Sequence, residues 1–250
     1  MIQQISPVLQ LRQASVLPRL SPTTAECHRG ELLHIIGPNG AGKSTLLARV
    51  AGLLAGTPLS QYTAADLAVR RAYLAQQQPP LALMPVFQYW QRHQPPLAQE
   101  YAVEQVVHSL AERLMLTDKL ARPLTQLSGG EWQRVRLVAA LLQIWPTINP
   151  HARLLLLDEP TNSLDVAQQV ALDSLLSELC RLGIAVVVCA HDLNHSAHHA
   201  DRVWLLSAGV LVAQGETANV MLPEVLSPVF GVAFQRHVVD GRNWIITRSA

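Results

Sequence analysis

The stretch Gly37-Pro38-Asn39-Gly40-Ala41-Gly42-Lys43-Ser44-Thr45 decides the fold class of this chain. It has the pattern G-x-x-x-x-G-K-[ST], in which a glycine-rich backbone turns its N–H groups inward, toward a polyphosphate. In this pattern Lys43 supplies a positive charge for the β- and γ-phosphates, and the Ser44 hydroxyl is a ligand for Mg²⁺. A glycine-rich turn with a stray lysine is the alternative, and the flanking sequence decides against it.

The residues on both sides of this phosphate loop have the required pattern. Residues 32–36, with the sequence LLHII, predict a buried strand directly before it. After it, Leu46, Leu47 and Val50 recur at helical spacing, and Gly52 is a suitable helix end. The dipole of that helix adds positive charge where the phosphates would lie. We therefore expect an α/β fold of the P-loop NTPase class.

Length, charge and composition exclude several classes of protein. The chain has 250 residues, enough for one large α/β domain with or without a small subdomain. A net charge of +1 without a run of Lys or Arg argues against a nucleic-acid partner. Its three cysteines are widely spaced, which indicates a reducing compartment. We expect no signal peptide and no membrane span, so any membrane role would act through a partner.

Apolar patterns predict the core strands. Residues 154–157 and 184–190 are continuous apolar runs, as expected of strands buried on both faces of a parallel sheet. Residues 66–76 predict a short helix that passes into a strand ending near Gln76. Residues 203–213 and 232–247 each predict a β-hairpin. Before residue 30 we expect short strands, with turns at Pro18 and Pro22.

Helical spacing predicts the remaining elements. Helices are expected over residues 86–94, 103–116 and 166–182, and another from the segment 127–131 to Pro146. Residues 77–125 would then form a helical insertion between two core strands.

Polar residues follow several of the predicted strands, where open parallel sheets bind ligands. Asp158 suits a role in holding Mg²⁺, and Glu159 can polarise a water that attacks the γ-phosphate. His191 can donate a hydrogen bond to the γ-phosphate, and the Gln76 amide can reach both Mg²⁺ and water. The alternatives are an acidic pair at a turn, a capping or core histidine, and the neighbouring Gln77 or Gln78 in place of Gln76.

A second anion-binding pattern lies at residues 127–131, with the sequence LSGGE. Ser128, Gly129 and Gly130 would stand at a helix N-terminus, where backbone N–H groups face outward. A simple capping motif is the alternative. Because the chain already has a phosphate loop, we expect this signature segment to contact the nucleotide of a second molecule.

Taken together, these motifs resemble the full motif set of ABC-transporter ATPases. The resemblance covers nearly the whole chain and rests on motifs in a fixed order: 37–45, the Gln76 segment, 127–131, 154–159, 163–165 and His191. It implies one ABC ATPase domain over residues 1–250, with a mostly parallel core sheet, a small antiparallel β subdomain and an inserted α-helical subdomain at 77–125. It also implies a head-to-tail homodimer with two ATP at the interface.

The resemblance also implies a set of site residues. ATP-binding residues are Gly37, Pro38, Asn39, Gly40, Ala41, Gly42, Lys43, Ser44, Thr45, Ser128, Gly129, Gly130 and Asp165. The catalytic residues are Glu159, His191, Gln76 and Lys43, and the Mg²⁺ ligands are Ser44, Gln76 and Asp158.

A narrower resemblance suggests the transported substrate. Residues 71–78 (RAYLAQQQ), 128–137 (SGGEWQRVRL), 162–169 (NSLDVAQQ) and 191–195 (HDLNH) are similar to the ATP-binding subunits of bacterial vitamin B12 importers. This implies a peripheral protein on the cytoplasmic face of the inner membrane. Two permease subunits would dock on residues 76–96, where Phe87, Tyr89 and Trp90 gather, and a periplasmic cobalamin-binding protein would act indirectly.

Two alternatives remain beside vitamin B12 import. One is the ATPase of a related haem or ferric-siderophore importer, because this subunit would not touch the substrate. The other is a nucleotide-gated scaffold or DNA-associated ATPase, whose usual coiled coil, basic face or second ATPase domain is not found in the sequence. The chain departs from the family pattern at residues 53–59, where it is several residues short, and we expect a trimmed antiparallel edge there.

Overall fold

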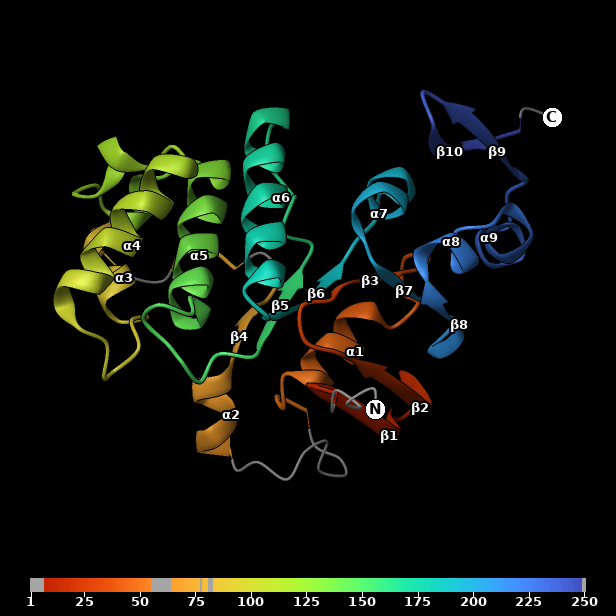
Figure 1. The fold of residues 1–250 in the computed structure, drawn as a ribbon, viewed down its shortest axis with the longest axis horizontal. Coiled ribbons are helices and arrows are strands. Elements are labelled where there is room, and N and C mark those ends of the chain that lie inside the picture. Colours follow the sequence, from red (N-terminus) through yellow and green to blue (C-terminus); the bar gives the residue numbers. More distant parts are fainter. Residues whose placement is uncertain (1–6, 55–63, 77, 81–82, 249–250) are drawn as a thin grey trace, which may run out of the picture. The chain divides into compact units, whose positions relative to one another are not determined.

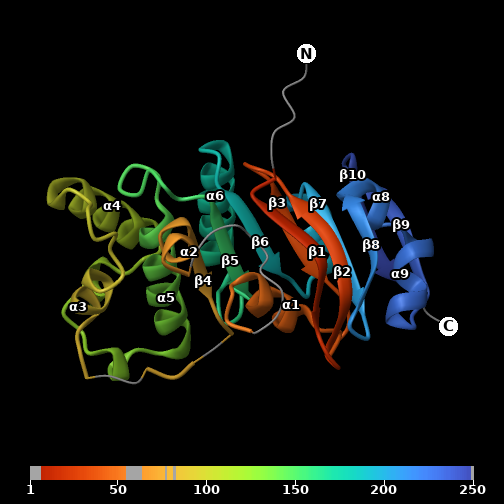
Figure 2. The same ribbon diagram turned by 90° about the horizontal axis from the view of Figure 1, so that it is seen from below.

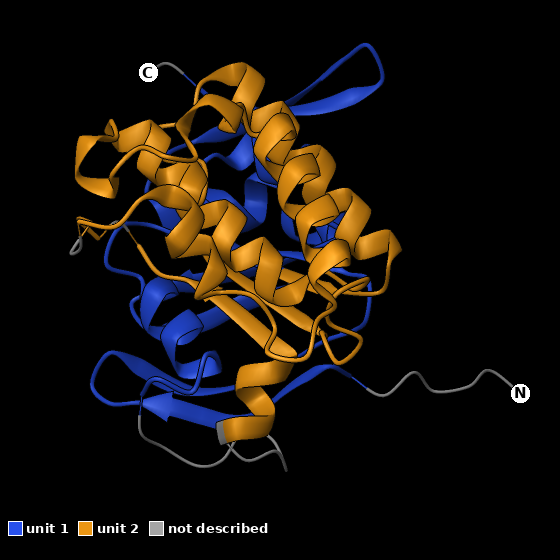
Figure 3. Ribbon diagram, turned by 90° about the vertical axis from the view of Figure 1, so that its left-hand side faces the viewer, with its two compact units in different colours: residues 1–61, 187–250 blue, residues 62–186 orange. Residues whose placement is uncertain are grey.

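The computed structural model describes residues 7–54, 64–76, 78–80 and 83–248 (Figure 1). The chain divides into two compact units (Figure 3). Unit 1 comprises Met1–Gln61 and Val187–Ala250, and unit 2 comprises Tyr62–Val186. Strand β6 (Ala185–Cys189) crosses the boundary between them.

Unit 1 opens with an antiparallel pair of strands, β1 (Leu9–Val16) and β2 (Leu20–Cys27), seen side by side in Figure 2. These are the short N-terminal strands expected from the sequence. The prediction of a turn at Pro22 is wrong, because Pro22 lies inside β2. The strand tolerates it because the register shifts between the pairs Ala14–Thr23 and Val16–Leu20, so Pro22 is not required as a donor.

The strand that precedes the phosphate loop is β3 (Leu32–Ile36), and all five of its residues are buried. It runs parallel to β7 (Arg202–Ser207), which continues through a tight turn into the antiparallel strand β8 (Val210–Glu216). Helix α1 (Lys43–Val50) follows the loop. The predicted strand at 32–36, the helix after the loop and the hairpin at 203–213 are therefore confirmed.

The rest of unit 1 consists of short elements around a small apolar core. These elements are α7 (Leu193–His199), α8 (Thr217–Val220), α9 (Pro223–Phe230) and the antiparallel pair β9 (Phe234–Val239) and β10 (Arg242–Thr247). The core residues are Ile36, Val203, Leu205, Val220, Met221, Leu226 and Ile245. Strand β9 starts two residues later than predicted, because Gly231 ends α9 in the left-handed region.

Unit 2 contains the other predicted core strands. Helix α2 (Ala64–Arg70) leads into β4 (Arg71–Leu74), which pairs in parallel with β5 (Leu154–Asp158). Every residue of β5 is buried, as its run of leucines predicts. At the start of β6, the Ala185 N–H donates to the Arg153 carbonyl over 2.9 Å.

Four further helices make up most of the remainder of unit 2. They are α3 (Val86–Gln91), α4 (Glu100–Arg113), α5 (Gly129–Ile144) and α6 (Val166–Arg181), with the short 3₁₀ turns η1 (Thr117–Lys119) and η2 (Leu124–Gln126). Helices α3 and α4 both pack on α5 (Figures 1 and 2). Helix α4 starts and ends three residues earlier than predicted, and Met115 adopts a positive φ of 55° just beyond its end.

The predicted domain boundaries stay predictions. They are one domain over residues 1–250 and a helical insertion at 77–125, and α3 and α4 lie within the range 77–125. The sequence predicts that the segment 53–59 is shortened. Most of it lies outside the described residues, because residues 55–63 are not described. Among the described residues, no helix has both the length and the apolar character that crossing a membrane requires.

Candidate nucleotide site

The phosphate loop is shaped by a glycine that no other residue can replace. Gly37 has φ 149°, and a Cβ atom built on it would lie 2.2 Å from the carbonyl oxygen of Leu206 on β7. The loop therefore packs against the backbone of the neighbouring strand, an approach that requires glycine. Helix α1 then begins at Lys43, directly after Gly42.

Lys43 places its ammonium group inside the loop. The side chain is buried, and Nζ donates to the carbonyls of Gly37 over 2.8 Å and of Pro38 over 3.1 Å. The loop backbone thus wraps around a cation, and Ser44 follows in the first turn of α1. A buried ammonium among carbonyl dipoles attracts an anion.

Unit 1 also brings His191 close to the strand that carries the loop. The N–H of Ala190 donates to the carbonyl of Ile35 over 3.0 Å, so the end of β6 lies beside the end of β3. One strand continues into the loop and the other into His191, which is exposed.

Unit 2 brings Gln76, Asp158 and Glu159 together at the ends of β4 and β5. Asp158 is the last residue of β5 and is buried, and Glu159 follows it with a positive φ of 51°. The Gln76 Nε2 donates to the Glu159 Oε2 over 3.3 Å, and the Asn162 Nδ2 donates to the same oxygen over 2.7 Å. Two amides therefore orient this carboxylate.

Sequence reasoning missed Asn162 as a residue of the site. Its only signal is its position three residues after Glu159, within a tight turn that returns its amide to the carboxylate. Such a contact depends on the turn conformation, which the residue pattern does not specify.

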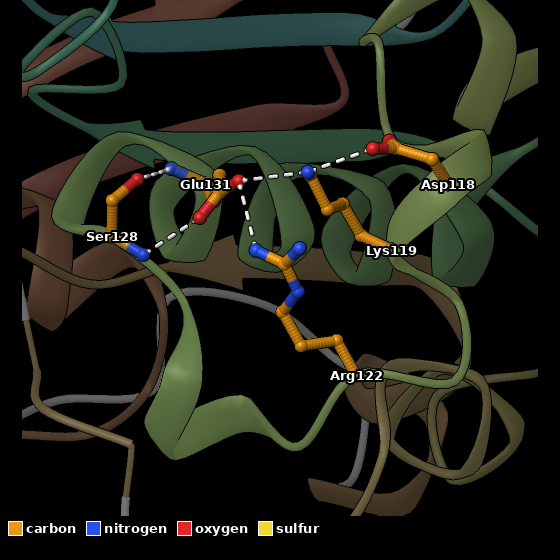
Figure 4. A network of polar contacts seen from close by, with 5 residues as sticks. All are labelled: Asp118, Lys119, Arg122, Ser128 and Glu131. Atoms are coloured by element: carbon orange, nitrogen blue, oxygen red, sulfur yellow. Dashed lines mark hydrogen bonds and ion pairs between the residues drawn. The ribbon is translucent and has the colours of Figure 1, made fainter.

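Ser128 stands at the N-terminus of α5 in a capping box, shown in Figure 4. Its Oγ accepts from the Glu131 N–H over 3.3 Å, and its own N–H donates to the Glu131 Oε2 over 2.8 Å. The hydrogen bond from the Ser128 backbone holds the pKa of Glu131 below its ordinary value. Lys119 and Arg122 approach the other carboxylate oxygen to 3.4 and 3.6 Å. The signature segment is thus a helix cap, as its alternative reading stated, and its nucleotide contact stays a prediction.

The turn at Ser163 lies against the signature segment. A Cβ atom on Gly130 would be 2.7 Å from the Ser163 carbonyl oxygen. Asp165 caps α6 by accepting from the Gln168 N–H over 2.9 Å, so its predicted nucleotide contact would come in addition to that role.

The aromatic residues predicted to dock a partner are not all exposed. Trp90 is 1% exposed, and its Nε1 donates to the Val135 carbonyl over 2.9 Å, so its prediction as a docking residue is wrong. Tyr89 packs against Trp132 with ring centroids 5.2 Å apart. Phe87 is 42% exposed and remains available. Helix α3 directs Trp90 inward toward α5. The amino-acid composition of the segment does not indicate which aromatic side chain faces inward.

Comparison with known proteins identifies the family. A family model described as "ABC transporter" matches residues 20–162, which is more than half of the chain. The chain belongs to the ABC transporter family. Its motifs and fold are those of an ATPase subunit of that family, with the α/β P-loop NTPase fold predicted from the sequence.

Relatives of this ABC protein cover nearly its full length. The chain is 93% identical over 250 residues to the vitamin B12 import ATP-binding protein BtuD of Pectobacterium atrosepticum, covering 97% of this chain and 100% of that protein. It is 55% identical to the protein of the same name from Yersinia enterocolitica, over 96% of this chain and 98% of that one. Among solved structures, an inward-facing metal-chelate type ABC transporter superposes with a TM-score of 0.76 at 23% identity over 98% of each chain. That likeness concerns the fold alone.

Proposed function

We propose that this chain hydrolyses ATP to power the import of vitamin B12 across the bacterial inner membrane. The observation that carries the proposal is the 93% identity to a vitamin B12 import ATP-binding protein over nearly the whole of both chains. At that identity almost all residues of the motifs and of the surfaces between them are the same in the two proteins. Few substitutions are therefore left that could change the transported substrate.

The nucleotide is held by the motif residues that the family resemblance assigns to it. The phosphate loop of residues 37–45 cradles the phosphates, and the buried ammonium of Lys43 meets the β- and γ-phosphates. Ser44, Gln76 and Asp158 offer the oxygen ligands that Mg²⁺ prefers, and the buried carboxylate at the end of β5 fits that ion. Bound there, Mg²⁺ would neutralise charge on the phosphates.

Glu159 orients the water that attacks the γ-phosphate in line, with Gln76 beside it. The motif order assigns His191 the role of a hydrogen-bond donor to the same phosphate. The support is geometric: the Glu159 carboxylate is fixed by the Gln76 and Asn162 amides rather than free to rotate. A carboxylate in a set orientation positions a water without reorganising during the reaction.

The role of Glu159 is tested by Glu159→Gln, compared with Glu112→Gln on the exposed side of α4. Glu159→Gln should bind ATP as the wild type does and lose about two to four orders of magnitude in turnover, since it lacks the carboxylate base. The control should keep full turnover. Wild-type turnover in Glu159→Gln would refute the assignment.

Two copies of the chain act together, with each ATP between the phosphate loop of one copy and Ser128, Gly129 and Gly130 of the other. The N-terminus of α5 supports this, because its capping box uses only the N–H groups of Ser128 and Glu131. The intervening N–H groups face outward at the positive end of a 16-residue helix.

Ser128→Arg tests the shared site, with Ser109→Arg on the exposed face of α4 as its control. A bulky cation at Ser128 should leave ATP binding by the separate chain intact, block closure of the dimer and abolish hydrolysis. Full hydrolysis by Ser128→Arg would exclude a site shared between copies.

The partners are two permease subunits docked on residues 76–96, with a periplasmic cobalamin-binding protein acting indirectly. The exposed side chains Phe87 and Leu83, 42% and 84% exposed, support docking on this segment. A chain docked in this way would be a peripheral protein on the cytoplasmic face of the inner membrane.

The substrate and partners are tested in one reconstituted system. The chain is co-purified in detergent with the membrane protein that it binds, and the complex is placed in vesicles that are assayed for ATP-dependent uptake of vitamin B12, haem and a ferric siderophore. Uptake of vitamin B12 alone supports the proposal. Uptake of haem or the siderophore instead, with no uptake of vitamin B12, would replace it by the related importer.

A further inference from the structure

One side of helix α5 carries two polar residues that are almost completely buried. Gln133 is 2% exposed and Arg136 is 6% exposed. With Gly130 they follow each other at three-residue spacing, so they lie along one side of the helix. Gly130 lies close to the turn at Ser163, and Gln133 and Arg136 follow it along the helix.

These two side chains connect the backbone on either side of the proposed reaction centre. The Arg136 Nη2 donates to the carbonyl of Ala75 over 2.6 Å and to that of Gln76 over 3.4 Å. The Arg136 Nη1 donates to the Gln133 Oε1 over 3.2 Å. The Gln133 Nε2 in turn donates to the Pro160 carbonyl over 3.1 Å.

The connection closes into a ring. Pro160 is covalently joined to Glu159, and Glu159 accepts from the Gln76 side chain over 3.3 Å. The backbone of Gln76 is held by Arg136. A path therefore runs from the Gln76 amide through Glu159, Pro160, Gln133 and Arg136 back to Gln76.

The buried guanidinium of Arg136 is costly to remove from water. Burial lowers the pKa of Arg136, which reflects the cost of removing the charge from water. Its hydrogen-bond acceptors are two backbone carbonyls and one amide oxygen, not a carboxylate. A well-packed apolar side chain of similar volume often serves stability equally well or better. The planar fork does something that an apolar side chain cannot, because it fixes the direction of the carbonyls that it binds.

We propose that Gln133 and Arg136 are positioning residues for ATP hydrolysis, which together set the placement of the Gln76 amide against the Glu159 carboxylate. This inference rests on the roles proposed above for Gln76 and Glu159. The two side chains are not proposed to contact the nucleotide or the attacking water. They act only through the backbone of residues 75–76 and of Pro160.

The same helix also holds the backbone further along the Gln76 segment. The Trp132 Nε1 donates to the Gln78 carbonyl over 2.6 Å, and the Trp132 ring packs at a tilt against Tyr89 of α3. Trp132 and Arg136 are one helical turn apart, so a single face of α5 grips this segment at Ala75, Gln76 and Gln78. A rotation of α5 would therefore move the Gln76 backbone with it.

The first experiment separates positioning from folding. Arg136→Met, Gln133→Leu and Arg136→Lys are measured in the purified transporter complex for ATP affinity, kcat and melting temperature. We expect kcat to fall about tenfold to a hundredfold in Arg136→Met and Gln133→Leu, as for a misplaced catalytic group, with ATP affinity within about twofold. Arg136→Lys retains the charge but not the fork, and it should recover only part of the loss. The control is Gln143→Leu, because the Gln143 side chain donates to the Ala139 carbonyl within α5 and does not contact residues 75–76 or Pro160 in the described structure.

The second experiment asks whether Arg136 acts through Gln76. Arg136→Met is combined with Gln76→Ala, and its effect on kcat is measured in both backgrounds. In the Gln76→Ala background it should lower kcat by less than about twofold, because the group that it positions is gone. If the two losses multiply, or if Arg136→Met and Gln133→Leu keep wild-type kcat, the positioning inference is overturned alone. If Gln76→Ala itself keeps wild-type kcat, the proposed role of Gln76 fails and the inference fails with it.

Discussion

At the scale of single residues, two adjacent glycines show how local space limits the signature segment. A Cβ atom on Gly130 would lie 2.7 Å from the Ser163 carbonyl oxygen, whereas one on Gly129 would meet nothing within 4 Å. Both glycines are in the first turn of α5. Their requirement for glycine therefore differs, because only one faces the turn at Ser163.

Gly130→Ala and Gly129→Ala should separate in thermal unfolding. Gly130→Ala forces the backbone at Ser163 to move and should cost about 1–3 kcal/mol. Gly129→Ala should change stability by less than about 1 kcal/mol and in the stabilising direction, because alanine favours the helix. Equal melting temperatures for the two variants would contradict the close approach between Gly130 and Ser163.

At the scale of elements, the N-terminus of α5 is held by an ionised side chain. Glu131 closes the capping box and contacts Lys119 and Arg122, with Lys119 also bound to Asp118 over 2.7 Å (Figure 4). The folded state holds the pKa of Glu131 below its ordinary value of 4.5, chiefly through the Ser128 backbone N–H. Its contribution to stability is therefore complete above about pH 4.5 and is lost as the pH falls through the lowered pKa.

Variants of Glu131 should show this pH dependence in denaturant unfolding measured from about pH 7 down to pH 3. Glu131→Ala should cost about 1 kcal/mol at pH 7, and its difference from the wild type should shrink as the pH falls. Glu131→Gln keeps the capping box but loses the charge, so its stability at pH 7 should lie between those of the wild type and Glu131→Ala. Glu100→Gln in the first turn of α4 is the control, as Glu100 is exposed. A constant difference between wild type and Glu131→Ala would rule out the ionised cap.

At the scale of the whole molecule, apolar side chains separate into a buried set and an exposed set. All five residues of β5 are buried, and so are all five of β3 and of β6. Leu83, by contrast, is 84% exposed, within the segment proposed to dock the permease. Burial indicates a role in stability for the first set, whereas exposed apolar side chains in one segment favour a binding role.

Leu156→Ala should therefore affect stability, whereas Leu83→Ala should affect binding to the permease. Leu156 is fully buried on β5, so its replacement should cost about 2–5 kcal/mol in the free energy of unfolding. Leu83→Ala should change stability by less than about 0.5 kcal/mol and should weaken co-purification with the permease. Retention of permease binding at wild-type strength by Leu83→Ala would remove Leu83 from the docking surface.

The sequence predicted most of what depends on local pattern. The strand at 32–36, the helix after Lys43, the buried leucine run of β5 and the helix that opens at residues 127–131 all follow from residue type and spacing. Each of these features is specified within about one helical turn or strand of neighbouring residues, and the motif order indicated the family. Boundaries were less secure, as the earlier start of α4 and the strand position of Pro22 show.

Only the tertiary structure decided which distant groups meet. It buried Trp90 against α5, brought Asn162 back to Glu159, and aimed Arg136 at the carbonyls of Ala75 and Gln76. The physical reason is that these contacts depend on helix rotation and turn conformation, which are set by packing over the whole of unit 2. By itself the sequence determined that a phosphate loop, an acidic pair at the end of a buried strand and a signature helix exist, and the packing of α5 determined what holds the Gln76 amide against the Glu159 carboxylate.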